Sequence, residues 1–264
     1  GMKFFPLKYE NRLLATSKYS PYVKISEGCN NNCTYCAIPL IRGKFRSRPF
    51  DEIVEECRHL INNGAKEINL ISQDTSRYGR DFSENKKSLL PELIREISKI
   101  KGVKLVRFLY LYPDEITDEL LYEVRDNPIV ASYFDIPIQH ISSSVLKRMN
   151  RRGDEDFVRN LLKKIRNIIP DSIIRTTYIV GFPGETEEDY NKLLKFTEEI
   201  EFDRLGVFTY SKEEDTASYN FTDDVPQEVK ENRMNEIMKL QKKISRKLNK
   251  KEVGKIHKTL VENY

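Results

Sequence analysis

Strand-like and helix-like segments alternate through the middle of this 264-residue chain. Each strand-like run is short and apolar, and the stretch that follows it repeats apolar residues every three or four positions. Such alternation predicts parallel strands joined by right-handed helical crossovers. The expected strands are 22–26, 67–71, 104–110, 133–138, 173–180 and 204–209, and the expected helices are 50–63, 88–100, 116–126, 143–149, 154–168 and 186–200.

These strand–helix units are compatible with two α/β folds. One is an open, doubly wound sheet. The other is a TIM-like barrel of parallel strands, here a partial (β/α)6 barrel because a full barrel needs eight units. In both folds the chemistry lies at the carboxyl ends of the strands. A site is therefore expected directly after the first strand.

Three cysteines follow that first strand within eight residues. Cys29, Cys33 and Cys36 have the spacing Cys-x-x-x-Cys-x-x-Cys. Three thiolates on one loop can ligate three irons of a 4Fe–4S cluster and leave the fourth iron open to a small molecule. A zinc ion would need a fourth Cys or His nearby, and Cys57 falls on the apolar face of the expected helix 50–63. We therefore predict an iron–sulfur cluster, with zinc as the alternative, and Cys57 as a core residue.

The overall composition is that of a globular chain. Hydrophobic residues make up 39% of the sequence, and no apolar stretch approaches the length of about 20 residues needed to cross a bilayer. The four cysteines are too few for a disulfide framework in a chain of this length, and no targeting segment is visible. These features predict a cytoplasmic protein without membrane contact.

Positive charge is concentrated in two places, although the net charge is only +4. One group follows the cysteines and consists of Arg42, Lys44, Arg46 and Arg48. The other lies on a charged helix expected over 226–251. For this helix a solvated face is preferred over a nucleic-acid surface. The group beside the cysteines is the better candidate for contact with an anionic partner such as RNA.

The cysteine segment resembles a known family. Cys29-Asn-Asn-Asn-Cys-Thr-Tyr-Cys36 is similar to the signature of radical S-adenosylmethionine (SAM) enzymes, and its continuation to Pro49 resembles the methylthiotransferases. Within these, three further stretches resemble the RimO group, which modifies an aspartate of protein twelve of the small ribosomal subunit. They are Ser72-Gln-Asp-Thr-Ser-Arg-Tyr-Gly79, Asp135-Ile-Pro-Ile-Gln-His140 and Gly181-Phe-Pro-Gly-Glu-Thr186.

The resemblance implies the partial barrel of the radical SAM core and a specific chemistry. In the family, the open iron chelates the amino and carboxylate groups of SAM. An electron from a flavodoxin or ferredoxin type of donor then breaks a carbon–sulfur bond of SAM to give a 5′-deoxyadenosyl radical. This radical removes hydrogen from the β-carbon of the aspartate, sulfur is inserted there, and a second SAM supplies the methyl group. The cofactors carry this chemistry while the protein positions them.

The resemblance also assigns roles to individual residues. Cys29, Cys33 and Cys36 are the implied cluster ligands, and they are the catalytic and metal residues of the site. The implied cofactor-binding residues are Tyr35, Ser72, Gln73, Gln139, Arg175, Thr177, Gly181, Gly184 and Phe208.

Simpler roles remain open for four of these cofactor-binding residues. Tyr35 could instead pack the cysteine loop, and Arg175 could form an ion pair with Asp135. Gly181 and Gly184 could belong to an ordinary turn before a capped helix. We assign no catalytic role to His140, because a buried imidazole is commonly a hydrogen-bonded structural group.

Related full-length proteins carry flanking pieces that this sequence does not contain in full. We expect residues 1–21 to be a linker from a missing N-terminal domain that would hold a second 4Fe–4S cluster. Residues 22–225 are the expected radical SAM barrel, 226–252 a C-terminal docking helix, and 253–264 the start of a truncated C-terminal β-domain. A tRNA adenosine methylthiotransferase is the alternative enzyme, and a zinc-containing nucleic-acid-binding module is the alternative outside enzymes.

Overall fold

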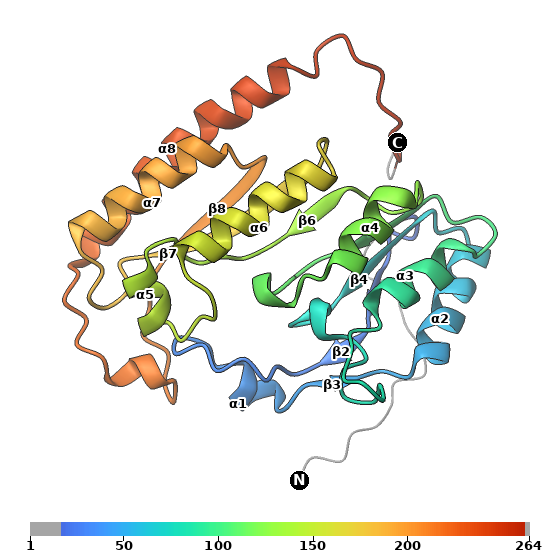
Figure 1. Cartoon of the computed structure of the whole chain (residues 1–264), viewed down its shortest axis with the longest axis horizontal. Helices are drawn as coiled ribbons and strands as arrows, with labels where there is room; N and C mark the ends of the chain where they lie inside the picture. The colour runs from blue at the N-terminus through green and yellow to red at the C-terminus, as the bar shows by residue number, and fades with distance from the viewer. Residues whose placement is uncertain (1–16, 262–264) are drawn as a thin grey trace.

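Six parallel strands follow one another in chain order in a computed structural model, which describes residues 17–261 (Figure 1). Strands β1 (Tyr22–Lys24), β4 (Glu67–Ile71) and β5 (Leu105–Phe108) form one sheet, and β6 (Tyr133–Asp135), β7 (Ile173–Val180) and β8 (Arg204–Thr209) form another. A parallel bridge between Val106 and Val130 joins the two sheets. Because neighbours in space are neighbours in the chain, the order is that of a barrel, whereas a doubly wound sheet would reverse it. The predicted partial barrel is confirmed.

Helices cover the outside of this layer of strands (Figure 1). The longer ones are α2 (Phe50–Asn62), α3 (Leu90–Ser98), α4 (Asp118–Asp126), α6 (Glu155–Ile168), α7 (Glu187–Ile200) and α8 (Gln227–Lys250). Contacts run from α2 to α3, α3 to α4, α4 to α6 and α7 to α8. Where a residue suited to N-capping precedes one of these helices, its side chain accepts a hydrogen bond from the backbone of the first turn. Thr186, for example, forms a capping box with Asp189 at the start of α7.

Several short elements complete the described chain. They are β2 (Ser26–Glu27), α1 (Ile38–Arg42), β3 (Arg46–Ser47) and α5 (Ser143–Arg148), together with the 3-10 helices η2 (Thr75–Arg77), η3 (Pro113–Glu115) and η4 (Ala217–Asn220). Most of them lie near the carboxyl ends of the strands, where the cysteine loop is also found.

The hydrophobic core lies between the strands and the helices. In β7, Ile174, Tyr178 and Val180 are fully buried, while the alternate residues are only half-buried. This period of two is that of a strand with one face packed against helices. Cys57 of α2 is also fully buried in this core, as predicted.

The other face of the strands is polar. Arg107 of β5 forms an ion pair with Glu67 of β4 at 2.8 Å, and its guanidinium lies 4.8 Å from the centre of the Tyr133 ring. Further along, Arg175 Nε lies 3.7 Å from Asp135 Oδ1. An inner face with this composition suits polar ligands better than a packed apolar core does.

Three strands, β1, β5 and β6, are shorter than predicted. The chain leaves the first sheet at Ile25, whose carbonyl accepts a hydrogen bond from Arg48 N–H, so that β2 pairs with β3 in antiparallel fashion. Strand β6 ends before Pro137, which has no N–H to donate. The Thr176 hydroxyl compensates by donating to the Ile136 carbonyl at 2.8 Å and accepting from Ile138 N–H at 3.3 Å.

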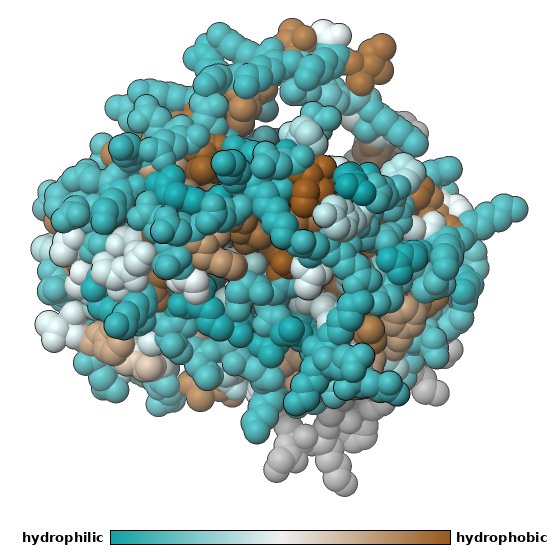
Figure 2. Space-filling model, in the orientation of Figure 1, coloured by the Kyte–Doolittle hydropathy of each residue, from teal (hydrophilic) through white to brown (hydrophobic). Residues whose placement is uncertain are grey.

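Beyond α8 the described residues form turns and irregular structure. The segment predicted as the start of a β-domain (253–264) forms no strand over its described residues, 253–261, and their side chains are exposed. Most of the predicted linker (residues 1–16) and the last residues of the predicted β-domain (262–264) lie outside the described residues. The face drawn in Figure 2 is mainly hydrophilic with small apolar patches. None of the helices within residues 17–261 combines the length and apolar character that crossing a bilayer requires.

Candidate active site

The cysteine loop leaves the barrel at the carboxyl end of β1, as predicted. Its base is closed by backbone contacts, since Cys29 N–H donates to the Gly43 carbonyl at 3.2 Å. Gly28 has a φ of +77°, and a Cβ atom on it would lie 2.4 Å from the Lys44 carbonyl oxygen. Only glycine allows this close approach of the two ends of the loop. The short β2–β3 pairing therefore holds the cysteines over the end of the sheet.

The three thiols influence one another electrostatically. Cys29 is buried, and Cys33 and Cys36 are half-buried. Burial raises the pKa of the Cys29 thiol, and the nearby Cys33 and Cys36 add to this increase. Burial likewise raises the pKa of Cys36, with a further contribution from Cys33. Metal ligation would reverse these shifts, because a bound thiol is deprotonated.

The donor set fits a cluster better than a single ion. Within residues 17–261 no three His, Cys, Asp or Glu side chains are grouped tightly enough to hold one metal ion. A cubic cluster places each thiolate on a different iron, so its ligands are spread more widely. Three thiols on one loop, without a carboxylate among them, are the ligands such a cluster requires.

A pocket of about 390 Å³ opens beside two of the cysteines. It is lined by Lys24, Cys29, Cys36, Ile38, Ile71, Ser72, Gln73 and Tyr110. Its volume falls in the range of small-molecule sites. The structure thus brings together four of the predicted site residues from two separate segments, the cysteine loop and the end of β4. Lys24 and Tyr110 were not predicted as site residues, although Lys24 is the last residue of β1 and Tyr110 closely follows the end of β5.

Ser72 and Gln73 are held in place by protein contacts. The Gln73 side-chain oxygen accepts a hydrogen bond from Gly28 N–H at 2.9 Å, and the Ser72 hydroxyl lies 3.2 Å from the Thr75 hydroxyl. The end of β4 is therefore tied directly to the start of the cysteine loop.

Four predicted residues lie on the other half of the barrel and do not line this pocket. Gln139 has a φ of +71°, and its carbonyl accepts from Ile179 N–H at 2.9 Å. Phe208 is 62% exposed. Thr177 accepts from Gln139 N–H through its carbonyl, and Arg175 is paired with Asp135 as in the simpler alternative. A SAM contact for these four residues stays a prediction.

The two glycines after β7 have protein neighbours. A Cβ atom on Gly181 would lie 2.2 Å from Lys230 Cγ of α8, and one on Gly184 would lie 3.1 Å from Arg148 Nε. The Glu185 carboxylate accepts from Gly181 N–H at 2.7 Å. These contacts account for the glycines as a turn against α8 and α5. Their role in cofactor binding is likewise still a prediction.

Tyr35 packs inside the cysteine loop. Its ring meets that of Phe182 edge to face, with 6.3 Å between the ring centres. Burial raises the pKa of its hydroxyl, which stays protonated at neutral pH. This packing agrees with the simpler alternative, and a contact between Tyr35 and SAM remains to be tested.

His140 is fully buried behind the pocket and is structural, as predicted. Its Nδ1 accepts from Ser142 N–H at 3.0 Å, so the proton is on Nε2, which faces Glu185 Oε2 at 3.7 Å. Burial lowers the pKa of His140 to about 3, and the nearby Arg148 and Arg233 also disfavour the charged form, against an opposing contribution from Asp189.

The low pKa of His140 predicts acid sensitivity. The unfolded chain has a histidine pKa of about 6.5, so the folded chain binds fewer protons and loses stability as the pH falls from about 6.5 towards 3. H140Q lacks this titration. The stability advantage of the unsubstituted chain over H140Q should therefore shrink by about 3 kcal/mol between pH 7 and pH 4. Urea unfolding of both proteins across this range measures the difference.

Glu185, which lies beside His140, also titrates in this pH range. Burial raises its pKa to about 7, so its own contribution falls as the pH rises from about 4.5 to 7. Because Glu185 Oε2 lies only 3.7 Å from His140 Nε2, the two groups are coupled, and the comparison is therefore repeated with E185Q in both proteins to remove the Glu185 contribution. A difference that stays constant from pH 7 to pH 4 would show that His140 titrates normally in the folded chain.

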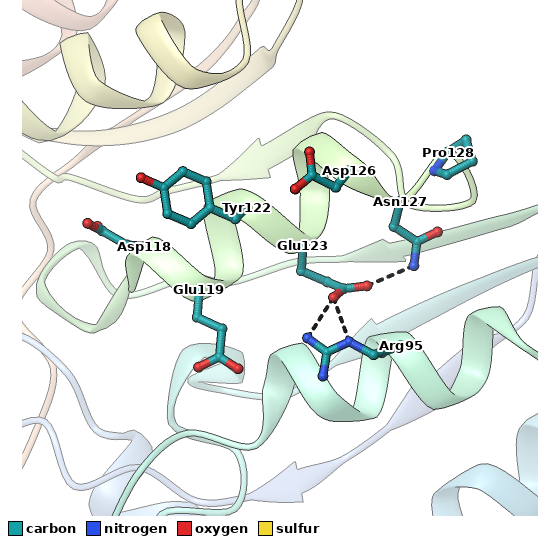
Figure 3. A pocket seen from close by; sticks show the side chains of 8 residues that line it. All are labelled: Arg95, Asp118, Glu119, Tyr122, Glu123, Asp126, Asn127 and Pro128. Carbon is teal, nitrogen blue, oxygen red and sulfur yellow. Dashed lines mark hydrogen bonds and ion pairs between the residues drawn. The ribbon is translucent and has the colours of Figure 1, made fainter.

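A larger pocket of about 620 Å³ lies on the outside of the barrel, between α3 and α4 (Figure 3). Glu123 lies at its centre, where Arg95 Nε donates to it at 2.9 Å and the Asn127 amide at 2.8 Å. Three other lining residues, Asp118, Glu119 and Asp126, are acidic side chains of α4, and Asp126 points away from Glu123 and Arg95 (Figure 3). The pocket contains none of the predicted site residues, and its polar contacts join two helices.

Comparison with known proteins agrees with this geometry. The model of the radical SAM superfamily matches residues 23–197. The ribosomal protein uS12 methylthiotransferase RimO of Alkaliphilus oremlandii is 51% identical over 257 residues, which cover 97% of this chain and 58% of that protein. RimO of Acetivibrio thermocellus is 49% identical over 251 residues, which cover 95% of this chain and 55% of that protein. The chain thus spans little more than half the length of these curated relatives.

Solved structures share the fold at low sequence identity. Coproporphyrinogen III oxidase (HemN) from Escherichia coli has a TM-score of 0.58 at 22% identity, covering 89% of this chain and 54% of that one. Methylornithine synthase (PylB) has a TM-score of 0.58 at 15% identity, covering 83% of this chain and 62% of that one. At these identities the likeness supports the fold alone.

Proposed function

The chain belongs to the radical SAM superfamily, and on this premise we propose that it is the catalytic core of a methylthiotransferase that modifies ribosomal protein uS12. The observation that carries the proposal is the pocket beside Cys29 and Cys36, which also contains Ser72 and Gln73. Further support comes from the relatives of about 50% identity over nearly the whole chain, which are named for this activity. Their names also favour a ribosomal protein over tRNA as the substrate.

The residues of the site would have the following roles. Cys29, Cys33 and Cys36 would hold a 4Fe–4S cluster, which when bound supplies the electron for SAM cleavage. The Asn31 N–H donates to Cys29 Sγ at 3.4 Å and so orients that ligand. Ser72 would contribute a polar contact to SAM, and Gln73 keeps the loop in place through Gly28.

Three finer points belong to this proposal. The full-length protein would carry a second cluster in an N-terminal domain as the route for sulfur, and a flavodoxin or ferredoxin type of protein would supply electrons. Action on a ribosomal protein would place the enzyme in the cytoplasm.

The basic group after the cysteines offers less to RNA than its sequence suggests, because Arg48 is paired with Glu56 at 2.7 Å and donates to the Lys24 carbonyl.

Anaerobic reconstitution with iron and sulfide tests the proposal. The chain should bind about four irons per molecule, since its sequence offers only one three-cysteine loop, and should cleave SAM to 5′-deoxyadenosine under a strong reductant. Sulfur transfer to uS12 is expected only from the longer protein, assayed against uS12 and tRNA side by side. A colourless sample without inorganic sulfide that leaves SAM intact would rule out the proposed function.

A further inference from the structure

The end of α5 is fastened to the cysteine loop. Thr34 N–H donates to the Met149 carbonyl at 3.1 Å, and the Thr34 hydroxyl donates to the Arg148 carbonyl at 2.9 Å. The Asn150 amide reaches the Asn32 carbonyl at 2.7 Å. Two segments that are far apart in the sequence are therefore held together by these hydrogen bonds. Arg151 is the residue directly after Asn150.

Arg151 is held on three sides. Its Nη2 donates to the Pro137 carbonyl at 2.6 Å, and its guanidinium lies 4.2 Å from the centre of the Tyr112 ring. Its Nη1 is 3.7 Å from Cys33 Sγ, within hydrogen-bonding range for sulfur. Stacking and the carbonyl together fix the direction in which this guanidinium points, which is towards the thiol.

The three thiols receive different donors. Cys29 accepts from the backbone of Asn31, and Cys36 from the backbone of Ile38. Cys33 instead faces the charged side chain of Arg151, together with the Tyr112 hydroxyl at 3.8 Å. Hydrogen bonds from a charged donor are roughly twice as strong as neutral ones. Among the three thiols of the loop, Cys33 is therefore the one that has a charged side-chain donor within hydrogen-bonding range.

The neighbouring arginine shows why Arg151 is unusual. Arg152 forms ion pairs with Asp114 at 2.7 Å and Glu115 at 3.3 Å. Within the described residues the direct contacts of Arg151 are a carbonyl, the Tyr112 ring and the Cys33 thiol, and the carboxylate that acts on it from further away, Asp114, is already paired with Arg152. A desolvated cation normally has an anionic partner. A thiolate of Cys33, as formed on metal ligation, would supply that negative charge.

We propose that Arg151 is a positioning residue that holds the Cys33 thiolate and makes the bound cluster easier to reduce. The proposal rests on the proposed function, because it requires a cluster on the three cysteines. Reduction adds one electron to the cluster, and a nearby cation stabilises the more negative form. Hydrogen bonds to ligand sulfur act in the same direction and are known determinants of cluster potential.

The test is a redox titration of the reconstituted cluster, followed by electron paramagnetic resonance in the absence of SAM. In R151Q the ratio of reduced to oxidised cluster at a fixed potential should fall about tenfold, which is about 59 mV for one electron. R151K keeps the charge and should restore most of this loss. R152Q is the matched control and should titrate like the unsubstituted protein, because Arg152 is already neutralised by carboxylates.

The outcomes separate this inference from the proposed function. If the unsubstituted chain assembles no cluster, the proposed function fails. If R151Q assembles the cluster with an unchanged potential, Arg151 has only a structural role and the inference fails. If R151Q holds too little iron to titrate, R151K decides. Iron loading in R151K close to that of the unsubstituted chain then supports the inference, because the charge alone restores the hold on the Cys33 thiolate, and loading as low as in R151Q contradicts it.

Discussion

Replacing Cys33 with alanine is expected to lower the iron content of the reconstituted chain from about four per molecule to below one. SAM cleavage should fall to the background rate. The reason is that each of the three thiolates holds a different iron, and the loop offers no fourth thiol to replace a lost one. Iron and sulfide analysis, with the charge-transfer absorption of the cluster, measures this result. C29A and C36A should behave in the same way.

C57A is the matched control for this prediction. Cys57 is fully buried on α2 among apolar side chains, and burial raises the pKa of its thiol. Removing its sulfur leaves a small cavity that should cost about 1 kcal/mol of stability. Iron loading and SAM cleavage should nevertheless match those of the unsubstituted chain. Equal loss of iron in C57A and C33A would mean that Cys57 is a ligand and that the cluster assignment is wrong.

The partial barrel was predictable because its signals are local. The apolar periods of α2, α6 and α7 and their caps lie within each segment, so the predicted ends agree with the structure to within one residue. The division of the first strand was not predictable in this way. It depends on the Ile25 carbonyl meeting Arg48 N–H, a contact that no periodicity encodes.

The candidate site was predictable only in part. The cysteine spacing, together with the resemblance to the radical SAM family, identified four residues that share the pocket. The sequence could not distinguish Arg151 from Arg152, which are adjacent and chemically identical. Only packing shows that both lie over the Tyr112 ring, but that one points towards a thiol while the other is neutralised by Asp114 and Glu115. Gly181 illustrates the converse, since its neighbour Lys230 comes from a helix that begins more than forty residues later.

The second large effect is expected at a buried ion pair that joins α8 to the turn after β7. Arg233 of α8 donates to Glu185 Oε1 at 2.9 Å, and both side chains are almost completely buried. The Glu185 carboxylate also accepts from Gly181 N–H at 2.7 Å and from Phe182 N–H at 3.3 Å. Removing Glu185 takes away the buried carboxylate partner of Arg233 and leaves only the exposed Glu187, at 3.0 Å from Arg233 Nη2. E185A should therefore lower the free energy of unfolding by about 3–5 kcal/mol at pH 8, where the carboxylate is ionised.

R233M should cost less than E185A, and its cost should depend on pH. Without the guanidinium, Glu185 keeps two backbone donors and can also take up a proton, because burial already raises its pKa to about 7. The folded variant then binds a proton that the unfolded chain releases above about pH 4.5, so the penalty of R233M should be smaller at pH 6 than at pH 8. Urea unfolding at the two pH values measures this. An equal penalty at both would show that the carboxylate stays ionised without its partner.

A double-mutant cycle then isolates the pair itself. The double variant E185A/R233M removes both charges, so it should be more stable than the sum of the single losses predicts, by about 2 kcal/mol or more. The matched control is Lys247–Glu201, which also joins α8 to the barrel but with side chains 60% and 29% exposed. Its cycle should give less than about 1 kcal/mol, since solvent screens an exposed pair. Similar coupling in both cycles would mean that burial does not strengthen the Glu185–Arg233 contact, and that α8 is held mainly by its apolar stripe.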